Sequence, residues 1–166
     1  MSKKTLTYLT ILCLITITGC GNSNKKEVPA ETVMPIEQDA TQKNIQAQLG
    51  DSLVSTESNE ESGITADNYE NSTFAGHEGK ISFFYNEDGS VLYYKWFILE
   101  KEEKKAKEIY SDVCQALEGS YGDGEENNSA TSGLYTTSFT NDKQQITAQL
   151  QKANGSGYEI SYMVVG

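Results

Sequence analysis

The stretch KISFFYNEDGSVLYYKWFIL, residues 80–99, carries the strongest structural signal in this chain. Residues 80–85 and 90–99 are rich in aromatic and β-branched side chains, as strands are. The sequence NEDG at 86–89 lies between them and consists of turn formers, with Gly89 able to take a positive φ. The pattern predicts a β-hairpin. Its second strand places four apolar side chains on the face opposite Lys95: Leu92, Tyr94, Trp96 and Ile98.

The segment that follows, residues 100–118, has a helical period instead. Lys and Glu surround an apolar stripe, and Gly119 is placed as a helix stop. The pattern predicts an amphipathic helix, whose stripe consists of Ala106, Ile109, Tyr110, Val113 and Leu117.

Beyond a polar loop at 120–132, strands are predicted at 134–139, 144–151 and 158–165. Residues 144–151 alternate between apolar and polar side chains, which indicates a sheet with one wet face. The order ββαβββ predicts an α+β fold over residues 73–166, a two-layer sandwich of one helix on a mostly antiparallel sheet of about five strands.

The region before this domain, residues 20–72, has a different composition. Asn, Ser, Thr, Gln and Glu dominate, and aromatic residues are almost absent before Tyr69. With so little apolar surface, the segment is predicted to be a disordered acidic tether. The alternative is a transient helix over 36–49, suggested by a thin apolar stripe of Ala40, Ile45 and Leu49.

The first nineteen residues have the organisation of a secretory signal. Lys3 and Lys4 precede an uncharged segment rich in Leu and Ile, residues 5–18. A segment of about 14 residues matches the apolar region of a signal peptide and is shorter than the ~20 residues of a membrane span. Residues 1–19 are therefore predicted to be a signal peptide.

The end of this signal, Ile17, Thr18, Gly19 and Cys20, resembles the lipobox of bacterial lipoproteins. The resemblance implies cleavage between Gly19 and Cys20 and a diacylglyceryl group on the Cys20 sulfur; some members of the family are also N-acylated at the new terminus. It places the chain on the cell membrane, facing outside the cytoplasm, held by a lipid anchor. The alternative is an uncleaved anchor or an ordinary signal in which Cys20 is incidental.

Charge and cysteine content exclude two other classes. All 13 basic residues are Lys, and the net charge is −11 at pH 7, so nucleic acid is not expected as a partner. Cys13 lies in the signal and Cys20 in the lipobox, which leaves Cys114 alone. The exported domain is therefore expected to fold without an intrachain disulfide, with Cys114 as a small apolar side chain beside the helix stripe.

The aromatic group Tyr85, Tyr93, Tyr94 and Trp96 is the candidate binding face. One helix cannot cover both faces of a sheet, so some of these rings are expected to face solvent, a protein or a glycan. Packing of the same rings in the core is the alternative.

Three other groups are interpreted without a catalytic or metal role. His77 has no recognisable nucleophile or carboxylate motif and is interpreted as a surface histidine. The residues at 86–89 resemble a calcium loop, but Phe84 and Lys95 stand where that loop needs carboxylates. The remaining cluster is interpreted as an acidic surface loop: Asp123, Glu125 and Glu126.

These interpretations predict a noncatalytic binding module for a protein, a peptide or a cell-wall component, with no cofactor beyond the lipid on Cys20. An accessory or structural subunit of an envelope complex is the first alternative, and a lipoprotein enzyme is the second.

Overall fold

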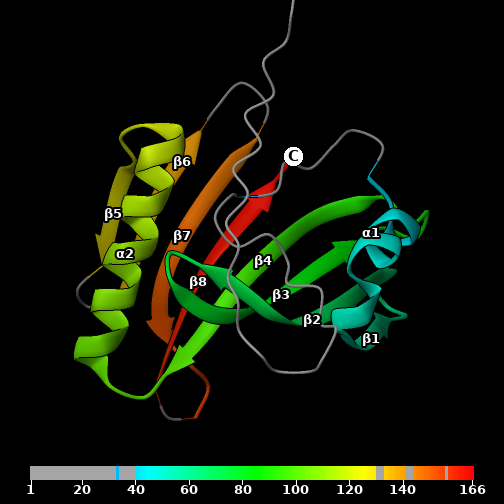
Figure 1. Cartoon of the computed structure of the whole chain (residues 1–166), viewed down its shortest axis with the longest axis horizontal. Helices are drawn as coiled ribbons and strands as arrows, with labels where there is room; N and C mark the ends of the chain where they lie inside the picture. Colours follow the sequence, from blue (N-terminus) through cyan, green and yellow to red (C-terminus); the bar gives the residue numbers. More distant parts are fainter. Residues whose placement is uncertain (1–32, 34–39, 130–132, 141–143, 156) are drawn as a thin grey trace, which may run out of the picture.

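In the part of the chain that the structure describes, two α-helices lie on one face of an eight-stranded antiparallel sheet (Figure 1). The structure is a computed structural model and describes residues 33, 40–129, 133–140, 144–155 and 157–166. Within these ranges no helix is long and apolar enough to cross a membrane.

The described elements form two halves, each a helix followed by four strands. The first half consists of α1 (Gln42–Leu49), a short 3-10 helix (Gly50–Ser52), β1 (Leu53–Asn59), β2 (Ile64–Phe74), β3 (His77–Tyr85) and β4 (Val91–Glu100). The second half consists of α2 (Glu103–Tyr121), β5 (Glu125–Ser129), β6 (Leu134–Thr140), β7 (Gln145–Lys152) and β8 (Tyr158–Val165). The strand order β1-β2-β3-β4-β8-β7-β6-β5 joins the halves through their last strands.

The predicted fold class is wrong. A sandwich of one helix on about five strands in the order ββαβββ was expected, whereas the structure has eight strands and two α-helices. Residues 40–72, inside the range expected to be a tether, form α1, β1 and most of β2, and the predicted loop at 120–132 contains β5.

The polar composition of β1, β2 and β5 explains why the sequence pattern did not predict them. β5 is exposed along its whole length, and β1 is exposed over most of it, as edge strands can be. β2 carries Asp67, Asn68, Glu70 and Asn71, residue types that are depleted in strands or neutral there. Their backbone pairing is nevertheless complete enough to connect β1 with β3.

The predicted hairpin at residues 80–99 is confirmed as β3 and β4. Gly89 has a φ of 80°, and its N–H donates to the carbonyl of Asn86 at 2.9 Å. Ser90 closes the turn, since its N–H and its hydroxyl both donate to one carboxylate oxygen of Asp88, at 2.9 and 2.6 Å.

The predicted helix is present but extends further than expected. α2 continues past Gly119 and ends at Gly122, which has a φ of 81° and donates its N–H to the carbonyl of Glu118 at 2.9 Å. The helix packs on β6, β7 and β8. Its buried residues are Ala106, Ile109, Val113 and Leu117.

The core lies between the helices and the sheet and is rich in aromatic rings. Trp96 is fully buried, stacks on Tyr162 with centroids 5.7 Å apart, and donates its indole N–H to the carbonyl of Ser72 at 3.2 Å. Gly79 leaves room for this indole, because a Cβ at that position would stand 2.7 Å from the Trp96 ring.

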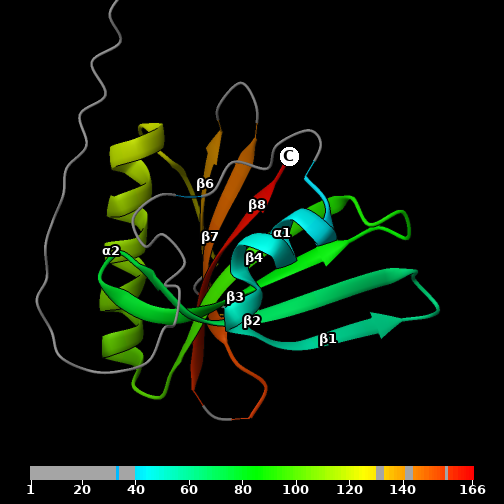
Figure 2. The same ribbon diagram turned by 45° about the vertical axis from the view of Figure 1, so that its right-hand side comes forward.

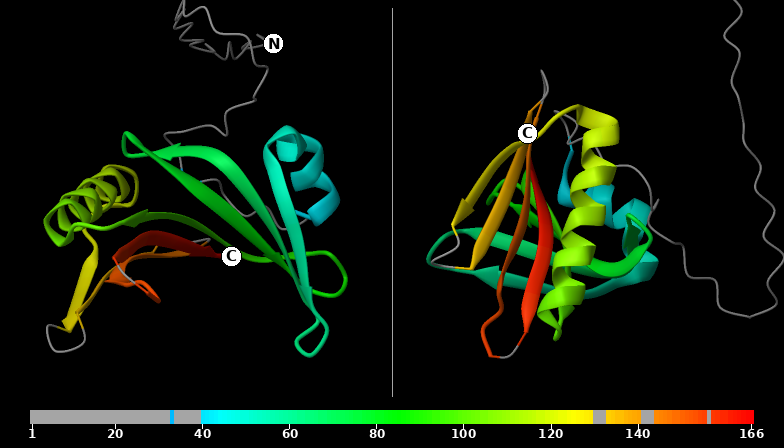
Figure 3. Two further views of the ribbon diagram at one scale, coloured as in Figure 1. Left: turned by 90° about the horizontal axis from the view of Figure 1, so that it is seen from below. Right: turned by 90° about the vertical axis from the view of Figure 1, so that its left-hand side faces the viewer.

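The tip of the β2–β3 hairpin leaves the sheet toward α2 (Figures 1 and 3). β3 pairs with β4 only from Lys80 onward, while its first residues pair with β2 alone. Asn71, with a φ of 60°, lies at the irregularity where β2 bends. Seen from below, the sheet is an arch with both helices on its outer side (Figure 3).

Candidate binding face

One face of the sheet carries neither described helix, and we call it the open face (Figures 2 and 3). Strand register assigns its residues, because partners across an antiparallel ladder point to the same side. Lys95 pairs with Ser82 on β3 and with Met163 on β8, so all three belong to this face. Its apolar centre consists of Phe84, Tyr93, Phe97, Leu99, Met163 and Val165.

The flank of the open face on β6 and β7 is polar and uncharged. Register places hydroxyl and amide side chains on it in successive rows. Such groups donate and accept hydrogen bonds without the desolvation cost of a charge. The flank consists of Thr136, Ser138, Gln145, Thr147, Gln149 and Gln151.

A stacked aromatic pair lies on β3 and β4. The centroids of Phe84 and Tyr93 are 4.3 Å apart and their planes are 18° from parallel. Both residues are partly exposed. Partial burial of Tyr93 raises the pKa of its phenol above the usual range. The pair therefore presents apolar ring surface with a neutral hydroxyl at its edge.

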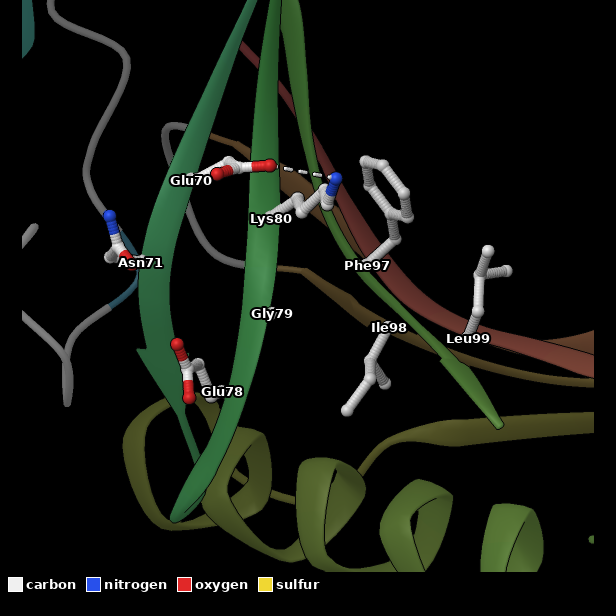
Figure 4. A pocket seen from close by; sticks show the side chains of 8 residues that line it. All are labelled: Glu70, Asn71, Glu78, Gly79, Lys80, Phe97, Ile98 and Leu99. Atoms are coloured by element: carbon white, nitrogen blue, oxygen red, sulfur yellow. Dashed lines mark hydrogen bonds and ion pairs between the residues drawn. The ribbon is translucent and has the colours of Figure 1, made fainter. Parts of the chain in front are cut away.

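Two ion pairs cross the open face. Lys80 Nζ lies 3.1 Å from Glu70 Oε1, as Figure 4 shows, and Lys95 Nζ lies 2.7 Å from Glu159 Oε1. Glu159 also accepts a hydrogen bond from the Gln151 amide at 3.1 Å. Lys95 lies 5.4 Å from the centroid of the Phe97 ring, within cation–π range.

A short polar ladder joins the first three strands. The Ser82 hydroxyl donates to the amide oxygen of Asn68 at 2.6 Å, and the Asn68 amide nitrogen donates to the Ser55 hydroxyl at 3.1 Å. These contacts fix side chains that lie between the apolar centre and the β1 edge.

Three hollows lie along the β1–β4 part of this face. One of about 510 Å³ is lined by Phe84 and Tyr93, and the next, of about 260 Å³, by Asn68 and Lys80. The third, of about 490 Å³, opens where β3 separates from β4 beside Phe97 (Figure 4). The second hollow shares Glu57 with the first and Glu70, Lys80 and Phe97 with the third, so the three lie in a row along this face.

The four aromatic residues expected to form the binding face lie on both sides of the sheet. Tyr85, Tyr94 and Trp96 are at most 1% exposed and belong to the core under the helices. Tyr93 is on the open face. The open-face rings that the sequence interpretation omitted are Phe84 and Phe97, although the alternation of each strand already places them opposite Tyr85 and Trp96.

The predicted lipidation and cleavage residues, Cys20 and Gly19, lie outside the described residues. The same holds for the predicted signal peptide.

His77 forms an ion pair with α2. Its Nε2 lies 2.9 Å from Asp112 Oδ2, and its side chain is 27% exposed. No hydroxyl or thiol is hydrogen-bonded to the ring in the described part of the chain, so the pair lacks the nucleophile of a catalytic triad. It ties the β2–β3 hairpin tip to the helix.

Cys114 is half-buried on α2. Burial raises the pKa of its thiol, which keeps the sulfur protonated and weakens it as a nucleophile. Within the described ranges, no three His, Cys, Asp or Glu side chains converge as metal ligands. Glu125 and Glu126 are exposed at the start of β5, and Asp123 precedes that strand.

A buried carboxylate that no sequence pattern predicted lies on the helix side of the sheet. Asp67 of β2 is fully buried and accepts hydrogen bonds from Thr56 Oγ1 at 2.6 Å and from Gln46 Nε2 at 2.9 Å. Gln42 and the Tyr69 hydroxyl also donate to it, at 3.2 and 3.3 Å. Asp67 therefore fastens α1 to the sheet.

Comparison with known proteins returned no match: no family model, no curated protein and no solved structure is similar to this chain.

Proposed function

We propose that this chain is a lipid-anchored lipoprotein outside the cytoplasm, and that its domain binds a protein partner through the open face without catalysing a reaction. The observation that carries the binding role is the helix-free side of the sheet, with its aromatic centre, its polar flank and its row of hollows. Apolar patches rimmed by polar groups are typical of protein interaction sites.

The composition of the open face favours a protein over a small molecule. The hollows are open and lie beside aromatic side chains, whereas small-ligand sites are deep and enclose most of the ligand. Aromatic residues are enriched at protein interfaces, and their polar rims limit access of water. A sheet face that is rigidly hydrogen-bonded also needs little ordering on binding.

The anchor is tested on the native protein. Intact-mass analysis of the membrane fraction is expected to find a chain that begins at Cys20 and carries a diacylglyceryl group. Cys20→Ala is expected to release the protein from that fraction. An unmodified sulfur at this position, or a chain that still begins at Met1, would overturn the anchor.

The binding role is tested by site-directed photocrosslinking of the full-length lipoprotein in cells. A photoreactive phenylalanine analogue is placed at Phe97 or Gln149 on the open face, and at Lys104 on the outer side of α2, where the side chain is 91% exposed. The same protein adduct is expected from both open-face positions and not from Lys104. Adducts that are equal at all three positions, or absent from the open face, would contradict the proposal.

A further inference from the structure

The hollow beside the Phe84–Tyr93 pair is lined by one row of side chains across four strands and by residues at the β1–β2 turn: Ser58, Asn59, Ser62 and Ile64. Register aligns Glu57 with Ala66, Ala66 with Phe84, and Phe84 with Tyr93 across β1 to β4. Adjacent strands lie about 4.8 Å apart, so Glu57 and Phe84 flank Ala66 on either side and their strands lie about twice that distance from each other. The small Ala66 side chain forms the floor, and the hollow above it has a volume of about 510 Å³.

Glu57 is the charged wall of this hollow, and its carboxylate lacks a cationic neighbour. None of the ion pairs among the described residues includes it, in contrast to Glu70 and Glu159 on the same face. Its contacts are long hydrogen bonds from Ser55 Oγ and Asn68 Nδ2, both 3.4 Å. Lone pairs therefore remain available on a carboxylate that lines the same hollow as the two aromatic rings.

The charges near this end of the face have the same sign as Glu57. Glu60 and Glu61 lie in the β1–β2 turn, and Glu87 lies against Gly63 at the end of that turn. These four carboxylates give a locally negative potential, which attracts a cation during encounter.

We infer that the hollow formed by Glu57, Ala66, Phe84 and Tyr93 receives an arginine side chain of the protein partner; this inference rests on the proposed function of the open face. A guanidinium is planar, stacks on aromatic rings and donates paired hydrogen bonds to a carboxylate. The hollow offers a ring pair on one side, a carboxylate on the other and a methyl floor between them.

The first test uses a model compound on the full mature lipoprotein in lipid nanodiscs. N-acetyl-arginine methylamide is titrated while NMR signals of Ala66, Phe84 and Tyr93 are followed, with the lysine and glutamine analogues in parallel. Saturable shifts confined to these residues are expected with arginine, weaker shifts with lysine and none with glutamine.

Two variants and a matched control assign the effect to the hollow. Glu57→Gln is expected to weaken arginine binding about two- to fivefold, as the loss of one partly exposed ion pair does. Ala66→Ile fills the floor with a side chain that strands favour, and is expected to abolish the shifts without unfolding the sheet. Glu60→Gln removes the same charge outside the hollow, so it loses only long-range attraction and is expected to weaken binding clearly less than Glu57→Gln.

The outcomes separate this inference from the proposed function. Equal weakening by Glu57→Gln and Glu60→Gln, or shifts spread over all surface carboxylates, would overturn the arginine site. An open-face photocrosslink whose yield is unchanged by both Glu57→Gln and Ala66→Ile would also overturn it, while the binding role stands. Saturable arginine binding with no open-face crosslink would support the hollow's chemistry and overturn the binding role.

Discussion

The rings of Phe84 and Tyr93 stack across β3 and β4, with their centroids 4.3 Å apart, on the side of the sheet that faces away from the helices. Their chain neighbours Tyr85 and Tyr94 point to the other side and are at most 1% exposed. Truncation of adjacent aromatic residues is therefore expected to lower the free energy of unfolding by different amounts.

Truncation of Tyr93 and of Trp96 is expected to affect stability very differently. Tyr93→Ala loses one partly exposed stacking contact and should lower the free energy of unfolding by about 1 kcal/mol. Trp96→Ala leaves a cavity in the core and should lower it by about 3–5 kcal/mol. Urea unfolding followed by circular dichroism measures both. Equal losses for the two variants would show that Tyr93 belongs to the core.

Removal of the buried Asp67 carboxylate is expected to detach α1. Asp67→Ala leaves the Gln46, Thr56 and Tyr69 donors without their acceptor, which should cost about 3 kcal/mol. Hydrogen exchange should accelerate over Gln42–Leu49 before it does so elsewhere. The exposed Asp51 provides the control, and Asp51→Ala should leave exchange in α1 unchanged. Unaltered protection of α1 in Asp67→Ala would refute the fastening role.

Two glycine-to-alanine substitutions are expected to change the stability of the domain in opposite directions. A Cβ at Gly79 would stand 2.7 Å from the Trp96 ring and from the Phe97 carbonyl oxygen, so Gly79→Ala should destabilise the domain by about 1–3 kcal/mol. Gly119 lies inside α2 with no atom near its Cβ position, and Gly119→Ala should stabilise the domain by about 0.5–1 kcal/mol. Thermal unfolding of both variants checks the signs, and a stabilised Gly79→Ala would contradict the packing at Trp96.

Alkaline pH is expected to destabilise the domain through two buried phenols. Burial raises the pKa of both Tyr69 and Tyr85 above the usual range, whereas in the unfolded chain they ionise near pH 10. Above that pH the unfolded state has released protons that the folded state retains. The free energy of unfolding should therefore be unaffected by these groups below pH 9 and fall as the pH rises past 10.

Tyr85→Phe isolates this contribution. The Tyr85 hydroxyl lies beside Tyr69 and Asp67 but has no hydrogen-bond partner of good geometry among the described residues. The variant should therefore be as stable as the parent or more stable at pH 7, and its stability should fall less between pH 9 and 11. Urea unfolding at each pH measures the difference, and an unchanged slope would refute the assignment.

The sequence predicted the elements whose apolar pattern is strong. The hairpin around Gly89 and the helix with its Ile109 and Val113 stripe follow from local alternation and period. The three strands after the helix are also present, as β6, β7 and β8. The pattern of side chains within each of these elements is enough to predict it.

The missing elements depend on contacts that no local pattern contains. Asp67 is buried in β2 only because Gln42, Gln46 and Thr56 surround it, and those residues come from α1 and β1. A segment with such a composition is typical of a tether when it is read alone. The exposed strand β5 is held by backbone pairing with β6, which side-chain periodicity does not report.

The candidate site could likewise be predicted from the sequence only in part. Alternation separates Tyr93 from Tyr94 and Trp96, but it does not say which side the helices cover. That choice depends on the side on which α1 and α2 pack, and α1 was only an alternative in the sequence interpretation.

The position of β8 at the middle of the sheet also constrains when the molecule can be completed. Tyr158–Val165 is the last of the described strands along the chain, yet it is the seam between β4 and β7. Because a polypeptide is synthesised from its N-terminal end, this seam is made after every other described strand. Until then the two half-sheets have no common edge, so the eight-stranded sheet can close only once β8 has been made.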